Sequence, residues 1–323
     1  MSYLADSFRP YWMPGINAVS GNVRFRLTAW LASGDYQMYL SPEQNKFSLN
    51  ISNFNPLLEA YAHDCSRMCL ASFETIEGIQ KHPTIPKSYA WIIIRLYYSA
   101  FYAAHAILRM LGISCSQIEN EQISMIAKIG NLFGFTASNQ ITGGFYKIYF
   151  EKISNSLTCS KLSSIGGGTH EKMWKIFHDT IKGISNEVLI DKNLTVNKQK
   201  LSTLLSELCY NLSYGNCTAG NWLSQVRNKT TYRHDYGVWF PYQGHLNYYE
   251  ELHEVINLWK MDPMNILLSR QPGKDLKRFF HTCCVIVAIC RILTLDMYKR
   301  CPSGKSFHNF GSIALFKRLQ ISF

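Results

Sequence analysis

The segment that most restricts the fold of this chain is an apolar helix predicted between residues 87 and 112, KSYAWIIIRLYYSAFYAAHAILRMLG. Its apolar side chains recur at steps of three and four residues, as they do on one face of an α-helix. Gly112 follows the last of them, where it can end the helix. This long apolar face indicates the centre of a helical body. The face consists of Ile93, Leu96, Tyr97, Ala100, Ala104, Ile107 and Leu111.

The same helix carries a second stripe of large side chains that form hydrogen bonds. Arg95, Tyr98, Tyr102, His105 and Arg109 follow one another at nearly heptad spacing. Such a stripe is either a surface edge with its hydroxyl groups in water or the wall of a cleft, and the spacing does not decide between the two. We take Arg95, Tyr98, Tyr102 and His105 as a candidate cleft wall.

Helical patterns continue on both sides of this segment. One helix is predicted to begin at Asn55, which can cap it, with Pro56 in its first turn. Residues 113–170 are less regular, and Thr169 can cap the helix that follows them. Further helices are predicted over residues 170–184, 199–211, 221–234, 248–260 and 274–298. The sequence therefore predicts an all-α fold, a helical bundle.

The first 52 residues have a different pattern. NVRFRLTAW and QMYL alternate between apolar and polar residues around Gly34 and Asp35, which favours short strands or a hairpin. We expect a small β-rich segment over residues 1–52, a helical domain over 53–270 and a basic helical region over 271–323 that packs on the bundle.

Positive charge is concentrated near the C-terminus. Lys and Arg outnumber Asp and Glu by 33 to 22, and from residue 270 onward ten cations face two acids. A basic surface favours a polyanionic partner such as nucleic acid or an anionic membrane. The first residues lack the pattern of a signal peptide, and the most apolar run, 279–290, is shorter than a bilayer span. We therefore expect a cytoplasmic protein that makes no membrane contact.

The sequence predicts neither a metal site nor a cofactor. The ten cysteines form no CxxC pair, so buried reduced thiols are favoured over structural zinc. SSIGGGTH, residues 163–170, lacks the lysine of a phosphate-binding loop. Near PSGKS, Lys299 occupies the position of the first glycine of such a loop.

The candidate chemistry lies in RNKTTYRHDYG, residues 227–237. On a helix over 221–234, Arg227 and His234 return to nearly the same face, about 10 Å apart along the axis. RNA cleavage without a metal needs a base, an acid and a cation beside the phosphorane. One such histidine per chain provides one proton-transfer group, so a symmetric dimer would pair two. An Arg and a His at this spacing also occur by chance on solvated helices.

The segment RNKTTYRHDY resembles the Arg-x4–6-His motif of the HEPN family (higher eukaryotes and prokaryotes nucleotide-binding). The ending His234-Asp235-Tyr236 is similar to that of toxin members. RLYYSAFYAAHAILRMLG and HEKMWKIFHDTI also resemble helices of this family, so the similarity covers roughly residues 55–260. The resemblance implies a dimeric helical bundle and a metal-independent endoribonuclease that leaves a 2′,3′-cyclic phosphate. It also implies a role in toxin–antitoxin or anti-phage systems.

By this resemblance, Arg227 stabilises the phosphate, Asn228 is its polar neighbour and His234 transfers a proton. Tyr236 matches a tyrosine that antitoxins adenylylate in some members, which makes it a candidate for regulatory modification.

Two functions follow from these patterns. The first is a ribonuclease toxin or defence effector, with RNA, a second copy of the chain and an antitoxin or regulatory protein as partners. Lys229, Tyr232 and Arg233 would hold RNA beside the site, and the basic C-terminal region would extend the contact. The alternative is a non-catalytic helical interaction or scaffold protein. The Arg–His pair favours the enzyme, because a scaffold needs neither residue.

Overall fold

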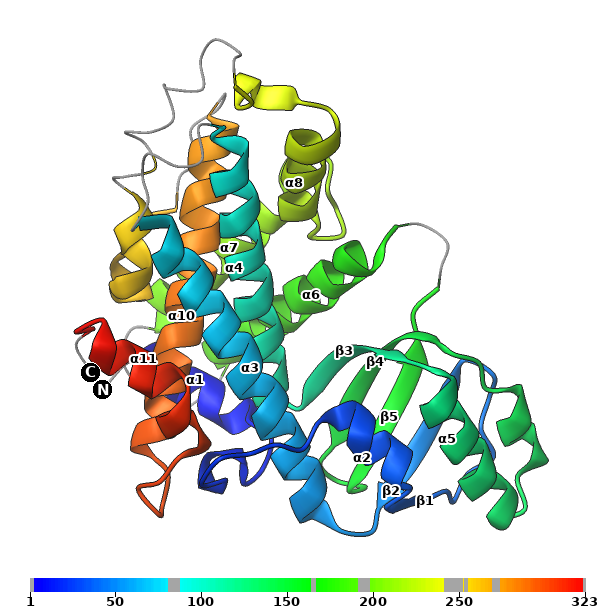
Figure 1. Cartoon of the computed structure of the whole chain (residues 1–323). Helices are drawn as coiled ribbons and strands as arrows, with labels where there is room; N and C mark the ends of the chain where they lie inside the picture. Colours follow the sequence, from blue (N-terminus) through cyan, green and yellow to red (C-terminus); the bar gives the residue numbers. More distant parts are fainter. Residues whose placement is uncertain are drawn as a thin grey trace.

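The computed structural model describes residues 3–80, 88–163, 167–190, 198–240, 252, 255–268 and 274–321. A body of long helices lies beside a β-sheet (Figure 1). Three helices pack together at the centre of this body: α3 (Phe54–Gln80), α4 (Ala90–Met110) and α10 (Asp275–Lys299). Around them lie α1 (Tyr3–Phe8), α6 (Thr169–Ile190), α7 (Lys198–Leu212), α8 (Trp222–Tyr232) and α11 (Ser312–Arg318).

The sheet makes the fold mixed α/β, so the all-α prediction is wrong. Its five antiparallel strands run in the order β1-β2-β5-β4-β3. They are β1 (Tyr36–Gln37), β2 (Lys46–Ile51), β3 (Ile113–Ile118), β4 (Gly144–Glu151) and β5 (Ser156–Lys161). In β4, Tyr146, Ile148 and Phe150 are buried while their neighbours are half-exposed, which is the two-residue period of a strand. β3, β4 and β5 thus come from residues 113–170, the stretch in which the sequence shows no regular helical spacing.

The N-terminal segment supplies helices as well as strands. Residues 22–30, predicted to be extended, include the start of α2 (Leu27–Ser33), which buries Trp30 and Leu31. Gly34 ends α2 with a φ of 77°, and a Cβ there would lie 3.0 Å from the Met125 sulfur of α5 (Asn120–Leu132). Only glycine adopts this conformation in so little space without strain. The Gly-Asp pair therefore ends a helix and does not turn a hairpin.

The two strands of the N-terminal segment, β1 and β2, belong to the same five-stranded sheet as β3, β4 and β5. β2 pairs with β5 from Lys46 opposite Ser160 to Asn50 opposite Ser156. In Figure 1, α2 and α5 lie over one face of the sheet. The N-terminal segment is thus joined to the rest of the fold by backbone hydrogen bonds.

The predicted long helices are confirmed, with small shifts at their ends. α3 begins at Phe54, one residue before the predicted cap, and α6 begins at Thr169. Leu96, Ala100 and Ile107 of α4 are fully buried, as their spacing predicts. Most of the helix predicted over 248–260 lies outside the described residues, and Asn257–Lys260 form a 3-10 turn.

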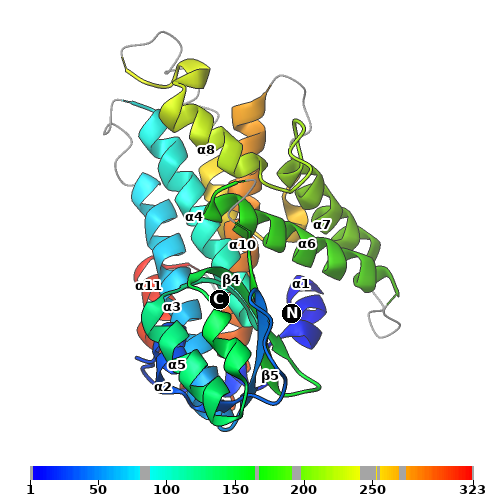
Figure 2. The ribbon, with the colours of Figure 1, turned by 90° about the vertical axis from the view of Figure 1, so that its right-hand side faces the viewer.

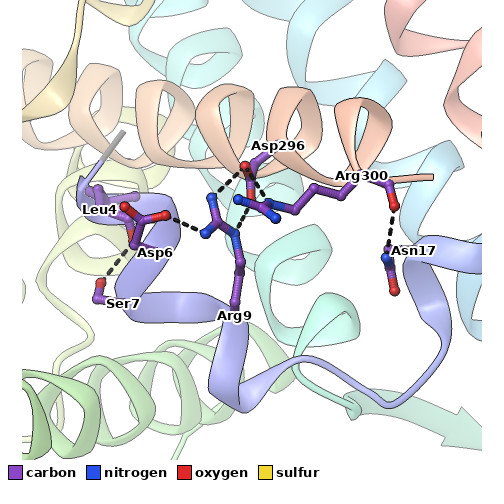
Figure 3. A network of polar contacts seen from close by, with 7 residues as sticks. All are labelled: Leu4, Asp6, Ser7, Arg9, Asn17, Asp296 and Arg300. Atoms are coloured by element: carbon purple, nitrogen blue, oxygen red, sulfur yellow. Dashed lines mark hydrogen bonds and ion pairs between the residues drawn. The ribbon is translucent and has the colours of Figure 1, made fainter. Parts of the chain in front are cut away.

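A cluster of charged side chains joins α1 to the end of α10 (Figure 3). Arg9 donates from Nε and Nη2 to the two carboxylate oxygens of Asp296, at 2.6 and 2.7 Å, and also pairs with Asp6. Arg300 donates to Asp296 at 3.3 Å. Asp296 is thus the anion that holds two guanidinium groups together. Asn17 donates to the Arg300 carbonyl at 3.0 Å, which adds a second contact at this end of the helix.

Replacing Asp296 by alanine should lower the free energy of unfolding by about 2 kcal/mol, because the partly buried Arg9 and the exposed Arg300 lose their shared partner. Urea unfolding followed by circular dichroism measures the change. Asp179→Ala is the matched control, since its side chain is 60% exposed, against 15% for Asp296. Equal losses in the two variants would contradict a special role for Asp296.

Candidate functional site

The helix that carries the Arg–His segment ends before the histidine. α8 ends at Tyr232, so Arg227 and His234 do not share one helix face as predicted. His234 takes a left-handed conformation with a φ of 57°, and Tyr236 follows with a φ of 71°. Each such residue costs about 1–2 kcal/mol unless the surrounding structure supports it. The sequence indicates two helical turns here, and the structure has a sharp reversal.

Contacts with α4 account for this reversal. The backbone N–H of Ala90 donates to the carbonyl of Val238 at 3.1 Å, and the Val238 side chain is fully buried. The indole N–H of Trp239 donates back to the carbonyl of Thr230 at 2.7 Å. The chain must therefore turn after α8 to bring Val238 and Trp239 against the helical body.

Arg227 points into the protein, between α4 and α6. Its guanidinium lies 5.4 Å from the centre of the Tyr97 ring, and its Nε is buried without a hydrogen-bond partner. The Tyr97 hydroxyl accepts from Trp174 Nε1 at 3.1 Å and lies 2.7 Å from His170 Nδ1. Burial, and then the charge of Arg227, lower the pKa of His170 to about 4. Arg227 is thus grouped with Tyr97 and His170, two residues not predicted for the site.

Two of the predicted RNA contacts and the predicted proton-transfer residue lie at the surface. Tyr232 is 71% exposed, and Arg233 and His234 are exposed beside it. The Trp239 ring lies 5.6 Å from the His234 ring and 5.5 Å from the Trp91 ring. Trp91 and Phe240 are about half-exposed, at 49% and 53%. We call this set the α8 surface; it consists of Trp91, Tyr232, Arg233, His234, Trp239 and Phe240.

The remaining predicted residues of this segment are half-buried. Asn228 and Lys229 lie on α8, and Lys229 lines a cavity of about 300 Å³ together with Asp275. Tyr236 packs partly against the core.

The predicted cleft wall runs from solvent into the interior. Arg95 is exposed beside α3, Tyr98 and Tyr102 are half-buried, and His105 is buried. Among these four, His105 lines an open cavity of about 630 Å³ between α2, α3, α4, α5, α6 and the sheet. The stripe is therefore neither a uniform surface edge nor a single cleft wall.

Polar groups from distant segments meet in this cavity. Arg109 donates from Nη1 to His105 Nδ1 at 3.0 Å and from Nη2 to Ser116 Oγ at 3.2 Å. Burial, and then the charge of Arg109, hold the pKa of His105 well below its usual value. His170 also lines the cavity, from the start of α6. Sequence reasoning missed Ser116, because its stretch was assigned no element, and His170, because nothing in its predicted helix indicated that the start of that helix lies beside α4.

Part of the basic C-terminal region lies away from the α8 surface. Arg278 is buried, donates to Asn211 Oδ1 at 2.6 Å and lies 4.0 Å from the Tyr214 ring centre. Arg291 donates to the carbonyls of Trp259 and Met261. α11, which carries the exposed end of this region, lies away from α8 in both views (Figures 1 and 2). Two of the positive charges in this region, those of Arg278 and Arg291, thus hold parts of the protein together.

Two helices, Ala90–Met110 and Asp275–Lys299, are long and apolar enough to cross a membrane, but 67% and 83% of their apolar stretches are buried inside the protein. This burial is consistent with a soluble protein. All ten cysteines are unpaired, and Cys217 alone is not buried. Within the described ranges, no group of three or more His, Cys, Asp or Glu is arranged to hold a metal ion.

Comparison with known proteins gives no relative. No protein-family model matches the chain, and no curated protein or solved structure shows significant similarity to it.

Proposed function

We propose that this protein binds single-stranded RNA at the α8 surface and cleaves it without a metal ion. The observation that carries the proposal is the meeting of exposed aromatic rings, a cation and an imidazole on one surface. Tyr232, Arg233 and His234 follow one another there, beside the rings of Trp91 and Trp239.

Exposed rings and cations together suit a single strand better than a duplex. Unpaired bases stack on aromatic side chains with about 1–3 kcal/mol per base, whereas duplex RNA offers mainly its backbone. Trp91, Tyr232 and Phe240 are the most exposed rings of the α8 surface. Arg233 is exposed among them and can donate a fork of hydrogen bonds to a phosphate.

The proposed reaction is attack of the ribose 2′-oxygen on the adjacent phosphorus. A base takes the 2′-hydroxyl proton, the bond from phosphorus to the 5′-oxygen breaks, and an acid protonates that leaving oxygen. The products are a 2′,3′-cyclic phosphate and a 5′-hydroxyl. His234 is the proposed proton-transfer residue. Because Arg227 points inward, Arg233 is the cation that we propose for the phosphate.

A second copy of the chain would complete the site. One His234 provides one of the two proton-transfer groups, and a symmetric dimer with facing α8 surfaces would bring two together. We further propose a cytoplasmic toxin or defence role, with Tyr236 as a point of control by an antitoxin or another regulatory protein.

Purified protein should cut a labelled single-stranded RNA in the presence of EDTA. The reaction needs only protein side chains, so chelation should not reduce its rate. End-group analysis should find 2′,3′-cyclic phosphates, and the same sequence held in a duplex should be cut more slowly. An intact single strand, or cleavage that returns only with Mg²⁺, would overturn the proposal.

A non-catalytic interaction protein is a second candidate, because one exposed surface is apolar. Tyr39 and Leu40 are 61% and 72% exposed, and Leu132 and Phe133 at the end of α5 are 72% and 42% exposed. The Tyr39 and Phe133 rings lie 6.3 Å apart, so the two segments form one patch. Such a patch favours a protein partner. RNA that stays uncut, together with a stable protein complex formed through this patch, would support the interaction function.

A further inference from the structure

A buried arginine in the large cavity lacks a compensating anion. Arg109 is 2% exposed, and its two hydrogen bonds go to the neutral acceptors His105 and Ser116. Its Nε has no hydrogen-bond partner, and no described carboxylate forms an ion pair with it. A buried charge without a partner is costly. We infer that this cavity binds the phosphate group of a small ligand, whose negative charge compensates Arg109.

Hydrogen-bond polarity around Arg109 supports an anion. Arginine only donates, so His105 Nδ1 must accept, and its proton is assigned to Nε2. His170 also lines the cavity, and its Nδ1 lies 2.7 Å from the Tyr97 hydroxyl, which accepts from Trp174. His105 thus offers an Nε2–H that can donate to a phosphate oxygen.

Three carboxylates of the described chain, those of Asp64, Glu119 and Glu121, also line the cavity, and none of them forms an ion pair with Arg109. Asp64 pairs with Arg67 at 3.8 Å. Glu119 accepts a backbone N–H at the start of α5, and Glu121 accepts from Gln122 Nε2 at 3.4 Å. Two further cations, Arg26 and Arg67, also line the cavity. Of the three described cations that line the cavity, Arg109 is the buried one, and none of the carboxylates of the lining forms an ion pair with it.

The size and lining of the cavity indicate a small ligand. A volume of about 630 Å³ is in the range of small-molecule sites. Met68, Phe101 and Phe145 give part of the lining an apolar character, which suits the organic part of a phosphomonoester. Free phosphate shares the same anionic chemistry. The inference does not rest on RNA cleavage, because none of these residues belongs to the α8 surface.

The test is binding of inorganic phosphate and of ribose 5-phosphate, measured by calorimetry and by the melting temperature at constant ionic strength with chloride as reference. Wild type should bind at least one of them saturably and melt at a higher temperature with it. Arg109→Met should bind about tenfold more weakly or worse, since a charged hydrogen-bond donor is lost. Arg318→Met, which removes an exposed arginine from α11, should bind as wild type does.

The melting temperature of Arg109→Met without ligand shows whether this variant is folded. Replacing a buried, uncompensated charge by an apolar side chain of similar length should leave the melting temperature equal or higher. Should Arg109→Met nevertheless unfold, Arg67→Gln at the half-exposed edge of the cavity should weaken binding in a folded protein. Preference for ribose 5-phosphate would identify an organic phosphate, and equal or better binding of inorganic phosphate would identify free phosphate. Wild type that binds neither, or folded cavity variants that bind as wild type does, would overturn the inference.

Discussion

Replacing His234 is expected to lower RNA cleavage at least about a hundredfold, the usual contribution of a positioned acid or base. Two variants separate chemistry from folding. His234 has a φ of 57°, where alanine is strained and asparagine is tolerated. His234→Asn should therefore unfold at the same urea concentration as wild type and still lose activity, as His234→Ala does. Initial cleavage rates on a labelled single-stranded RNA measure the activity of both variants.

The control removes an imidazole elsewhere. His63→Ala on α3, away from the α8 surface, should keep full cleavage although it loses a 2.8 Å hydrogen bond to the Val23 carbonyl. Mixing His234→Asn with wild-type chains under exchange should depress activity more steeply than dilution, because mixed dimers would lack one of two histidines. Full activity in folded His234→Asn would remove His234 from the proposed mechanism.

Acid is expected to destabilise this protein well above the range in which carboxylates alone would act. His308 is fully buried, and burial lowers its pKa to about 4 from the usual 6.5. Between these two values the unfolded chain binds a proton that the folded chain does not. Stability is therefore retained above about pH 6.5 and lost as the pH falls toward 4, by about 2–3 kcal/mol at pH 4.5. His105 and His170, whose pKa values are also lowered, add to the loss.

Urea unfolding at pH 7.5 and pH 4.5 measures this loss, and His308→Leu isolates one residue. Neither ring nitrogen of His308 has a hydrogen-bond partner within the described structure, so leucine removes the proton site without removing a bond. The variant should lose about 2–3 kcal/mol less than wild type between the two pH values. Carboxylates contribute equally to both proteins and cancel in the comparison. An identical loss would show that His308 is not the cause.

The helices could be predicted from the sequence because their signal is local. The apolar steps that indicate α3, α4 and α10 recur within each segment, and the buried faces follow them. Caps and stops lie next to the same segments, as Thr169 does at α6. The sheet has no such signal. β2 pairs with β5 across more than a hundred residues, so its register is set by partners that no short window contains.

The candidate sites also depend partly on local sequence and partly on contacts between distant segments. Residue types that suit RNA contacts, Tyr232, Arg233 and His234, were identified from one short stretch, and they are exposed together. Their arrangement depends on contacts with α4, which end the helix at Tyr232 and turn Arg227 toward Tyr97. The cavity around Arg109 likewise joins α3, α4, α6 and the sheet. The sequence by itself thus determined the core helices and the chemistry available. Only the tertiary structure decided which side chains meet, because packing between distant segments overrides local periodicity.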